Sequence, residues 1–204
     1  MSTSIEVPAT ARERGRTAPA KLAHIVLRSP RYEEVIDWYR TVLEAEVMVG
    51  TPAVTFLTYD EEHHRIAVIN APGVADADPM AGGVDHVAFT YETVDDLFIT
   101  YERLKGLGIE PHWTINHGPT LSFYYADPDG NRVELQIDVF DTNEAVNAWM
   151  AQSDFGTNPI GVKVDPEELI ARHRAGEDRA TLLDRRVIDP ADLMAQLPDP
   201  PPAG

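Results

Sequence analysis

The sequence predicts an α+β fold in which two tandem βαβββ modules form an open, barrel-like cleft, followed by a C-terminal helical extension. Two observations support this architecture. The same order of apolar patterns, one strand, one helix and three strands, occurs twice along the chain. The first strand of each copy also places a histidine inside an apolar run, as LAHIVL (22–27) and VDHVAF (84–89). One module alone leaves an apolar sheet edge open, whereas two modules side by side can close around a cleft.

The first module is predicted over residues 21–72. Its first strand, KLAHIVLR (21–28), ends at Ser29-Pro30, because serine and proline favour a turn there. Apolar residues then recur at the spacing of one helix face in RYEEVIDWYRTVL (31–43), which predicts an amphipathic helix. Three short β-like runs complete the module: EAEVMV (44–49), AVTFLTYD (53–60) and HRIAVIN (64–70).

The second module is predicted over residues 84–140 and repeats this order. VDHVAFT (84–90) is a strand pattern, and TVDDLFITYERLKGLG (93–108) is a helix pattern with glycines at its end. DPDG (127–130), with proline at its second position, predicts a tight turn between the last two strands. The remaining strands are predicted in IEPHWTI (109–115), LSFYYAD (121–127) and NRVELQID (131–138).

Three segments lie outside the two modules. Residues 1–20 are predicted to be a flexible arm, and the Pro-, Gly- and Ala-rich stretch 71–83 is predicted to be a linker. Residues 141–204 do not repeat and form the predicted extension. Within it we expect two helices and a Pro-rich tail, at NEAVNAWMAQ (143–152), DPEELIARHRAG (165–176) and LPDPPPAG (197–204).

Composition limits the classes of function. The formal net charge is −17 and the chain has no basic patch, which argues against binding to nucleic acid. There is no apolar run of about 18 residues, and the N-terminus lacks the apolar core of a signal peptide. We therefore expect a cytoplasmic protein without a membrane partner. Because the chain has no cysteine, any metal must be held by His, Asp, Glu or other oxygen ligands.

Because side chains alternate along a strand, three residues that can bind a metal point away from the apolar faces of their strands. In NRVELQID the apolar residues share one face, and Glu134 lies on the other. The same alternation lets His24 and His86 point away from the helix-packed faces of their strands. Two histidines and one carboxylate with open coordination positions are the arrangement that holds non-haem Fe(II). The alternative is that both histidines are core residues hydrogen-bonded to backbone carbonyls.

The paired modules resemble the vicinal oxygen chelate superfamily, which includes glyoxalases, bleomycin resistance proteins and dioxygenases, over residues 21–140. HGPTLSFYYADPDGNRVELQ (117–136) resembles the signature of its type I extradiol ring-cleaving dioxygenases, and EEHHRIA (61–67) resembles their paired-histidine strand. The resemblance implies an Fe(II)-dependent oxidoreductase of aromatic catabolism. Its substrates would be O₂ and a catechol-type diol, such as 2,3-dihydroxybiphenyl, that binds iron through both hydroxyl oxygens.

The resemblance also implies roles for individual residues. The metal ligands fall on His24, His86 and Glu134. His64 takes the place of the active-site acid/base, and Tyr124 takes that of a tyrosine that donates a hydrogen bond to the bound diol. His117 resembles a further histidine beyond the ligands that orients substrate or assists proton transfer. His63 is expected to face away from His64, because neighbouring residues of a strand alternate between faces.

Two other functions remain as alternatives, a metal-dependent lyase or isomerase of the glyoxalase or epimerase kind, and a non-catalytic small-molecule binding protein. Glyoxalase-like members use four ligands, but the first module offers no carboxylate after His64 in its last strand, which favours the dioxygenase. Family habit favours Fe(II) over Mn(II), since the ligand types suit both metals. Typical extradiol enzymes carry a second double module, so here we expect the extension or a second subunit to cover the cleft, in a homo-oligomer.

Overall fold

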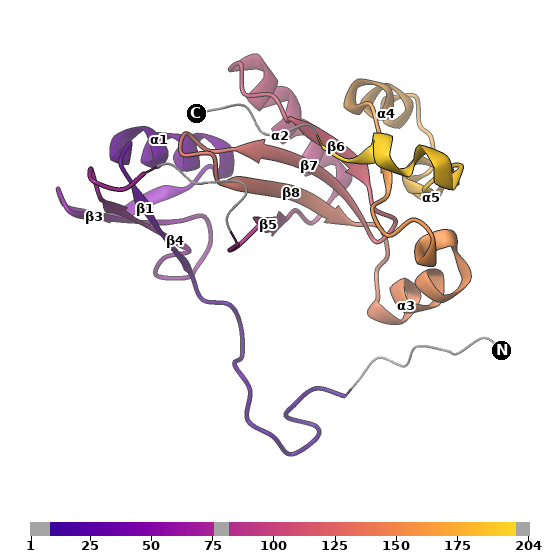
Figure 1. Ribbon diagram of the computed structural model, residues 1–204, viewed down its shortest axis with the longest axis horizontal. Helices are drawn as coiled ribbons and strands as arrows, with labels where there is room; N and C mark the ends of the chain where they lie inside the picture. Colours follow the sequence, from indigo (N-terminus) through magenta and orange to yellow (C-terminus); the bar gives the residue numbers. More distant parts are fainter. Residues whose placement is uncertain (1–8, 76–81, 199–204) are drawn as a thin grey trace. The chain divides into compact units, whose positions relative to one another are not determined.

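The computed structural model describes residues 9–75 and 82–198 (Figure 1). The chain divides into two compact units, the first made of residues 15–87 and 126–133 and the second mainly of residues 88–125 and 134–200. Parts of the predicted arm, linker and tail, residues 1–8, 76–81 and 199–204, lie outside the described residues. Among the described residues, none of the helices combines the length and the apolar character that crossing a lipid bilayer requires.

The first module forms a four-stranded sheet with one helix. Its elements are β1 (Ile25–Ser29), α1 (Tyr32–Leu43), β2 (Glu46–Gly50), β3 (Val54–Thr58) and β4 (Ile66–Asn70). The strand order is β1-β4-β3-β2, with β1 parallel to β4 and the other neighbouring strands antiparallel. Short connections turn β2, β3 and β4 back on one another, and β4 then pairs with β1.

The second copy repeats this arrangement and extends it by one strand. Its elements are β5 (His86–Thr90), α2 (Val94–Gly106), β6 (Trp113–Asn116), β7 (Thr120–Ala126) and β8 (Arg132–Asp138). The five-stranded sheet has the order β5-β8-β7-β6-β9, so its first four strands match the order of the other sheet (Figure 1). The predicted α+β fold with two βαβββ repeats and C-terminal helices is confirmed.

The C-terminal extension contains more than the two predicted helices. It comprises α3 (Asn143–Gln152), η1 (Asp154–Gly156), β9 (Val162–Lys163), α4 (Pro166–Arg174), α5 (Arg179–Leu183) and η2 (Pro190–Gln196). The predicted helices correspond to α3 and α4, whereas β9 and α5 are too short for periodicity to indicate them. Because β9 pairs antiparallel with β6, it covers that edge of the sheet.

Two strands begin later than their sequence patterns indicate. β1 starts at Ile25, one residue after His24, and β4 starts at Ile66, two residues after His64. Ahead of β1, the Nη1 atom of Arg65 donates to two backbone carbonyls, those of Leu22 and Ala23, at 3.1 and 3.0 Å. A side chain thus satisfies carbonyl groups that a longer strand would pair with backbone amides. Both histidines are therefore placed just ahead of their strands.

The predicted turn at residues 127–130 connects β7 and β8. The Asp127 carboxylate accepts from the backbone amides of Asp129 and Asn131, at 3.0 and 2.8 Å. Asp129 forms an ion pair with Arg31 at 3.0 Å, and this turn belongs to the first compact unit. Burial raises the pKa of Asp127, although its hydrogen bonds oppose that change.

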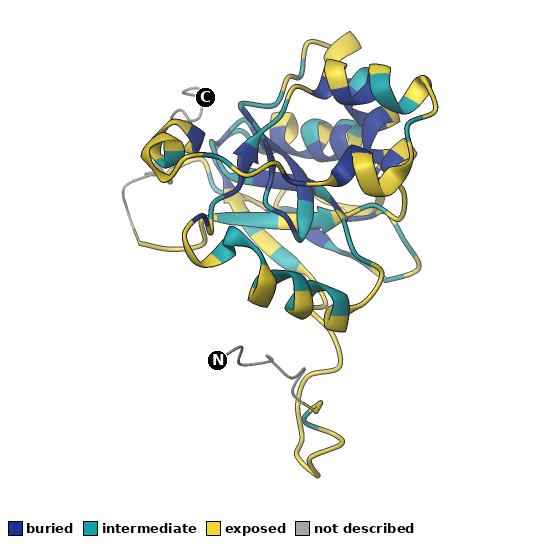
Figure 2. Ribbon diagram, turned by 90° about the vertical axis from the view of Figure 1, so that its right-hand side faces the viewer, coloured by how far each residue is buried: buried dark blue, intermediate teal, exposed yellow. Residues whose placement is uncertain are grey.

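The core of the second unit lies between α2 and one face of β7, where the ribbon is coloured as buried (Figure 2). Phe123 is completely buried, and its ring centroid lies 6.5 Å from that of Phe98 and 5.6 Å from that of Tyr101. Tyr124, the next residue, places its side chain on the opposite face of the strand. There its ring centroid lies 4.6 Å from that of Trp113 on β6. One face of the sheet is thus occupied by α2, and the other carries Tyr124.

Helix α2 begins with two reciprocal hydrogen bonds. The Thr93 hydroxyl accepts from the Asp96 amide at 3.1 Å, and the Asp96 carboxylate accepts from the Thr93 amide at 3.2 Å. This capping box satisfies two amides that have no partner inside the helix. It explains why the helix begins where the sequence predicts.

We expect Thr93→Ala to lower the free energy of unfolding by about 1 kcal/mol, because an amide of the first turn loses its acceptor. Thr41→Ala is the matched control, since the Thr41 hydroxyl lies inside α1, donates to the Asp37 carbonyl and caps no helix end. Its expected change is below about 0.5 kcal/mol. Urea unfolding followed by circular dichroism measures both variants, and equal losses would contradict a specific role of the cap.

Candidate active site

Three aromatic rings gather at one end of the first sheet. The ring centroids of His24 and His64 lie 4.3 Å apart, and Phe56 meets His64 edge to face at 4.9 Å. Val26, two residues after His24, is in register with Ala67, which is in turn in register with Phe56. Val26 is 51% exposed, so this face of the sheet is open. The first unit therefore presents an apolar surface beside two imidazoles.

The environment of His64 favours an uncharged imidazole. Partial burial lowers its pKa, and the nearby His24 and His63 lower it further. The Nδ1 atoms of His63 and His64 lie 2.5 Å apart, so one of them donates to the other. The prediction that His63 faces away from His64 is wrong, because residues 61–63 form a bend ahead of β4 and do not alternate like a strand. A neutral imidazole in this position can accept a proton.

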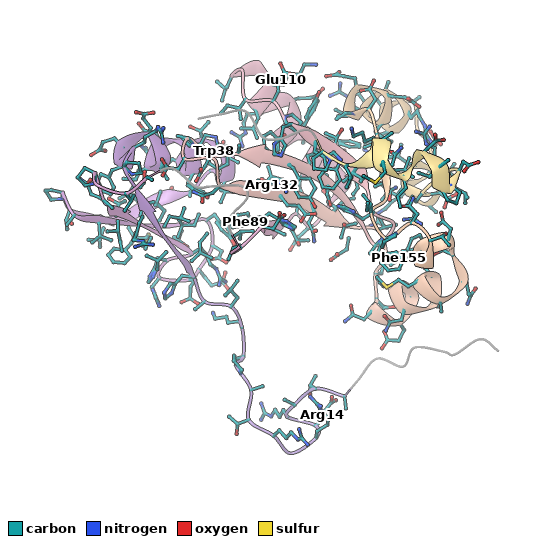
Figure 3. The ribbon with its side chains drawn as sticks, viewed as in Figure 1. Arg14, Trp38, Phe89, Glu110, Arg132 and Phe155 are labelled. Carbon is teal, nitrogen blue, oxygen red and sulfur yellow. The ribbon has the colours of Figure 1, made fainter. Side chains whose placement is uncertain are left out.

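A carboxylate orients His86, the first residue of β5. The Nδ1 atom of His86 lies 2.7 Å from Oδ2 of Asp85. Arg132, labelled in Figure 3, lies at the start of β8 and donates from Nη1 to both Asp85 oxygens at 3.1 Å. The hydrogen bond from His86 lowers the pKa of Asp85, so this group is an ionised acceptor. Nδ1 of His86 then carries the hydrogen, and the lone pair of the neutral ring is on Nε2.

Glu134 lies in β8 and is only 4% exposed. It shares a face of the strand with Gln136, whereas the completely buried Leu135 lies on the other. Gln136 donates from Nε2 to the Thr90 hydroxyl on β5 at 3.0 Å, so the Glu134 face carries polar groups. A buried carboxylate is costly unless a cation or hydrogen-bond donors surround it. The position of Glu134 thus suits a charged partner.

His117 and Tyr124 form a hydrogen-bonded pair in the second unit. His117 Nε2 lies 3.0 Å from the Tyr124 hydroxyl, and His117 Nδ1 is hydrogen-bonded to the carbonyl of Ile160. The Trp113 ring packs against both, with its centroid 5.5 Å from that of His117 and 4.6 Å from that of Tyr124. The structure therefore brings together two of the predicted site residues.

The predicted site residues divide between the two compact units. The first unit contains His24, His64 and His86, and the second contains His117, Tyr124 and Glu134. Within the part of the chain that the structure describes, no three His, Asp or Glu side chains cluster closely enough to hold a metal ion. The assignment of His24, His86 and Glu134 as metal ligands therefore stays a prediction, based on donor type and family resemblance.

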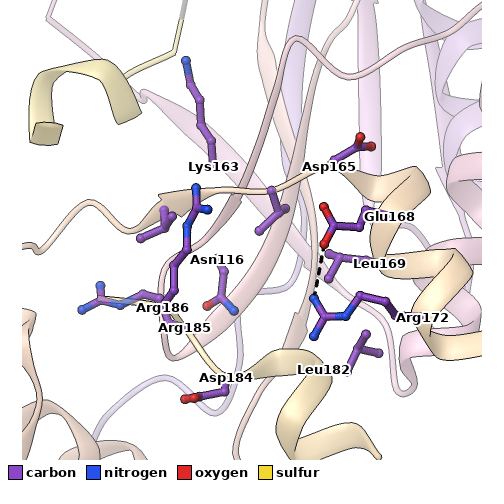
Figure 4. A pocket seen from close by; sticks show the side chains of 12 residues that line it. Asn116, Lys163, Asp165, Glu168, Leu169, Arg172, Leu182, Asp184, Arg185 and Arg186 are labelled. Atoms are coloured by element: carbon purple, nitrogen blue, oxygen red, sulfur yellow. Dashed lines mark ion pairs between the residues drawn. The ribbon is translucent and has the colours of Figure 1, made fainter. Parts of the chain in front are cut away.

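A pocket of about 390 Å³ lies in the second unit, lined by residues of β9, α4 and α5 together with Asn116 and Arg185 (Figure 4). None of the predicted site residues lines it. The sequence did not indicate Asn116 or Arg185, whose side chains connect the segment around His117 with residues far away along the chain. Asn116 accepts from the Gly118 amide and donates to the Leu183 carbonyl. The bond to Leu183 spans 67 positions, and no local pattern in the sequence indicates a contact of that range.

Two curated proteins from Rhodococcus globerulus are similar to this chain over most of its length. Biphenyl-2,3-diol 1,2-dioxygenase 2 is 49% identical over 151 residues, which cover 74% of this chain and 80% of that protein. Biphenyl-2,3-diol 1,2-dioxygenase 3 is 42% identical over 171 residues, which cover 83% of this chain and 90% of that protein. The chain thus spans most of both relatives.

Solved structures share the fold. Lactoylglutathione lyase from Agrobacterium tumefaciens has a TM-score of 0.50 and 20% identity, and the match covers 59% of this chain and 96% of that structure. A glyoxylase/bleomycin resistance protein/dioxygenase domain from Frankia sp. has the same TM-score and identity, over 59% of this chain and 99% of that structure. The model of the Glyoxalase/Bleomycin resistance protein/Dioxygenase superfamily matches residues 21–135, and the chain therefore belongs to that superfamily.

Proposed function

We propose that this protein is an extradiol dioxygenase, which uses O₂ to open a catechol-type ring beside its two vicinal hydroxyls. The observation that carries this proposal is the 49% identity to a biphenyl-2,3-diol 1,2-dioxygenase across 74% of the chain. A diol with a biphenyl-like substituent is therefore the first candidate substrate. The apolar side chains of exposed Val26 and half-buried Phe56, beside His24 and His64, support an aromatic substrate.

The proposed cofactor is Fe(II), with His24, His86 and Glu134 as its ligands. Two imidazoles and one carboxylate suit this ion. The His86 ring fits the role, because metal-binding histidines usually give their other N–H to a carboxylate, as Nδ1 here does to Asp85. The burial of Glu134 also fits, since a cation offsets its cost. When bound, the ion acidifies the diol hydroxyls and provides a path for electrons between the diol and O₂.

The proposed acid/base is His64. Its lowered pKa leaves the imidazole neutral near pH 7, so the ring can accept a proton from one diol hydroxyl and return it later in the reaction. Phe56, which meets this ring edge to face, limits its movement. Tyr124 provides a second polar contact for a diol oxygen, and its hydroxyl is held by His117.

Anaerobic reconstitution of the full chain with Fe(II) tests the proposal. Catechol, 3-methylcatechol and 2,3-dihydroxybiphenyl are added, O₂ is admitted, and oxygen uptake is followed together with the yellow ring-opened product. We expect one O₂ consumed per diol cleaved, and none with hydroquinone, whose hydroxyls are not vicinal. Bound iron without oxygen uptake on any diol would refute the dioxygenase and favour a lyase or isomerase. Light scattering of the same samples tests the predicted homo-oligomer.

His64→Gln is expected to lower kcat about 100-fold, since the variant cannot take up the diol proton. Its iron content should equal that of the unmodified protein. His173→Gln is the matched control, because His173 pairs with Asp95 and takes no part in the proposed chemistry. Steady-state oxygen uptake and metal analysis measure both variants. Equal kcat values for the two variants would remove His64 from the acid/base role.

A further inference from the structure

Residues of the C-terminal extension enclose the link between β6 and β7 that carries His117. The Arg185 side chain is completely buried, and its Nη1 atom donates to the carbonyls of His117 and Asn158, at 3.1 and 2.9 Å. Its Nη2 atom forms an ion pair with Asp154. The Trp149 ring lies against the guanidinium, with its centroid 4.8 Å away. Because a buried cation is stable only with such partners, the position of Arg185 is tightly constrained.

Two glycines show how closely the extension approaches this link. A Cβ atom on Gly118 would overlap the Trp149 ring, which also contacts Phe155 of the extension. A Cβ atom on Gly161 would lie 2.8 Å from the Cα atom of His117. Both glycines have positive φ angles, +100° and +117°, which side chains disfavour. His117 therefore cannot shift without displacing the extension.

The extension also determines which nitrogen of His117 carries hydrogen. A backbone carbonyl only accepts hydrogen bonds, so Nδ1, which is bonded to the Ile160 carbonyl, is the N–H. In the neutral ring the lone pair of Nε2 then faces the Tyr124 hydroxyl, 3.0 Å away. The hydrogen of that hydroxyl is directed to His117, so the phenolic oxygen can act toward a diol hydroxyl only through its lone pairs. Tyr124 then meets a diol hydroxyl as an acceptor, whereas family resemblance implies a donor.

We propose that the extension is a positioning element of the active site. Ile160 and Arg185 hold His117 as the Nδ1–H tautomer, and this tautomer makes Tyr124 a hydrogen-bond acceptor toward the diol. Arg185 touches no reacting atom and acts through His117. The effect on catalysis rests on the proposed dioxygenase function, but the tautomer is measurable without activity.

Two-bond ¹H–¹⁵N correlation spectra of the full chain, with labelled histidine rings and no added iron, test the tautomer. The chain has 7 histidines, and the spectrum of His117→Gln identifies the signal of His117 by its loss. We expect a protonated Nδ1 and an unprotonated Nε2 near pH 7.5. An Nε2–H tautomer or a doubly protonated ring would overturn the proposal, whatever the activity of the protein.

Kinetics of the iron-loaded protein test the coupling. Arg185→Met is expected to lower kcat about 10- to 100-fold, a loss like that seen when partners that orient metal ligands are removed. KM for the diol should stay nearly unchanged, because Arg185 does not touch the substrate. His117→Gln should have a similar effect, and the double variant should be no slower than either single variant, because the two residues act as a unit. Arg186→Met, which changes the exposed neighbouring arginine, is the matched control and should retain full activity.

The coupling between Arg185 and His117 and the proposed function can each fail separately. A loss caused by Arg185→Met that is equally large in the His117→Gln background would overturn the coupling, since Arg185 would then support only the fold. If Arg185→Met does not fold, Arg185→Lys replaces it in the same cycle because lysine preserves the charge opposite Asp154. No ring cleavage by the unmodified protein would refute the proposed function, and the tautomer would then decide the positioning claim alone.

Discussion

Glu134→Ala is expected to abolish iron binding and to lower kcat for ring cleavage by well over about 100-fold. Loss of a residue that only orients a ligand typically costs up to about 100-fold, and loss of the ligand itself should cost more. The variant removes the only carboxylate of the proposed ligand set. Without it, Fe(II) has two neutral imidazole ligands and no anionic one, so the ion is bound weakly. Iron content after gel filtration and oxygen uptake with a catechol measure the two effects.

Asp138→Ala is the matched control for this variant. Asp138 lies on the same strand and carries an exposed carboxylate, so its loss tests a charge on β8 without touching the proposed site. It should bind iron and cleave diols like the unmodified protein. Thermal melting of the metal-free proteins shows whether each variant is folded. A folded Glu134→Ala protein that retains stoichiometric iron would show that the ligand assignment is wrong.

Phe123→Ala is expected to lower the free energy of unfolding by about 3 to 5 kcal/mol. The ring is completely buried between Phe98 and Tyr101, and its removal leaves a cavity in a core that rigid neighbours cannot refill. Loss of apolar burial and loss of aromatic contacts act in the same direction. Urea unfolding followed by tryptophan fluorescence gives the midpoint and slope needed for the comparison.

Ile99→Ala is the control, because Ile99 lies on the same helix as Phe98 and is 61% exposed. Its expected cost is below about 0.5 kcal/mol. A loss below about 1 kcal/mol for Phe123→Ala would mean that the face between α2 and β7 is not the main core of this unit.

The repeated βαβββ order could be predicted because α1 and α2 are long enough for helical periodicity and are flanked by apolar runs. The ends of the strands could not. β6 begins at Trp113 rather than residue 109, since Pro111 has no amide hydrogen to donate to a ladder. β9 pairs with a strand far away in the chain, and a two-residue strand has no periodicity. Contacts of this kind depend on tertiary structure, which local patterns do not record.

In the candidate site, too, some features could be predicted from the sequence and others could not. Residue types and strand alternation indicated His24, His86 and Glu134, and family resemblance added His64, Tyr124 and His117. The partners that orient these side chains were not predictable. Asp85 is the neighbour of His86, but Arg132, which holds Asp85, is separated from it by 47 positions. The acceptor for His117 is a backbone carbonyl, which has no signature in a sequence.

The turn at residues 127–130 is encoded in the second copy of the repeat, yet it belongs to the first compact unit, where Asp129 pairs with Arg31. The boundaries of the repeat and of the compact units are therefore different. If the chain were divided within the predicted linker, the N-terminal half would lack residues 126–133 of the first compact unit. The C-terminal half would carry those residues without the rest of that unit. We therefore expect each half to need the other for its complete structure, although the sequence pattern alone would divide the chain at the linker.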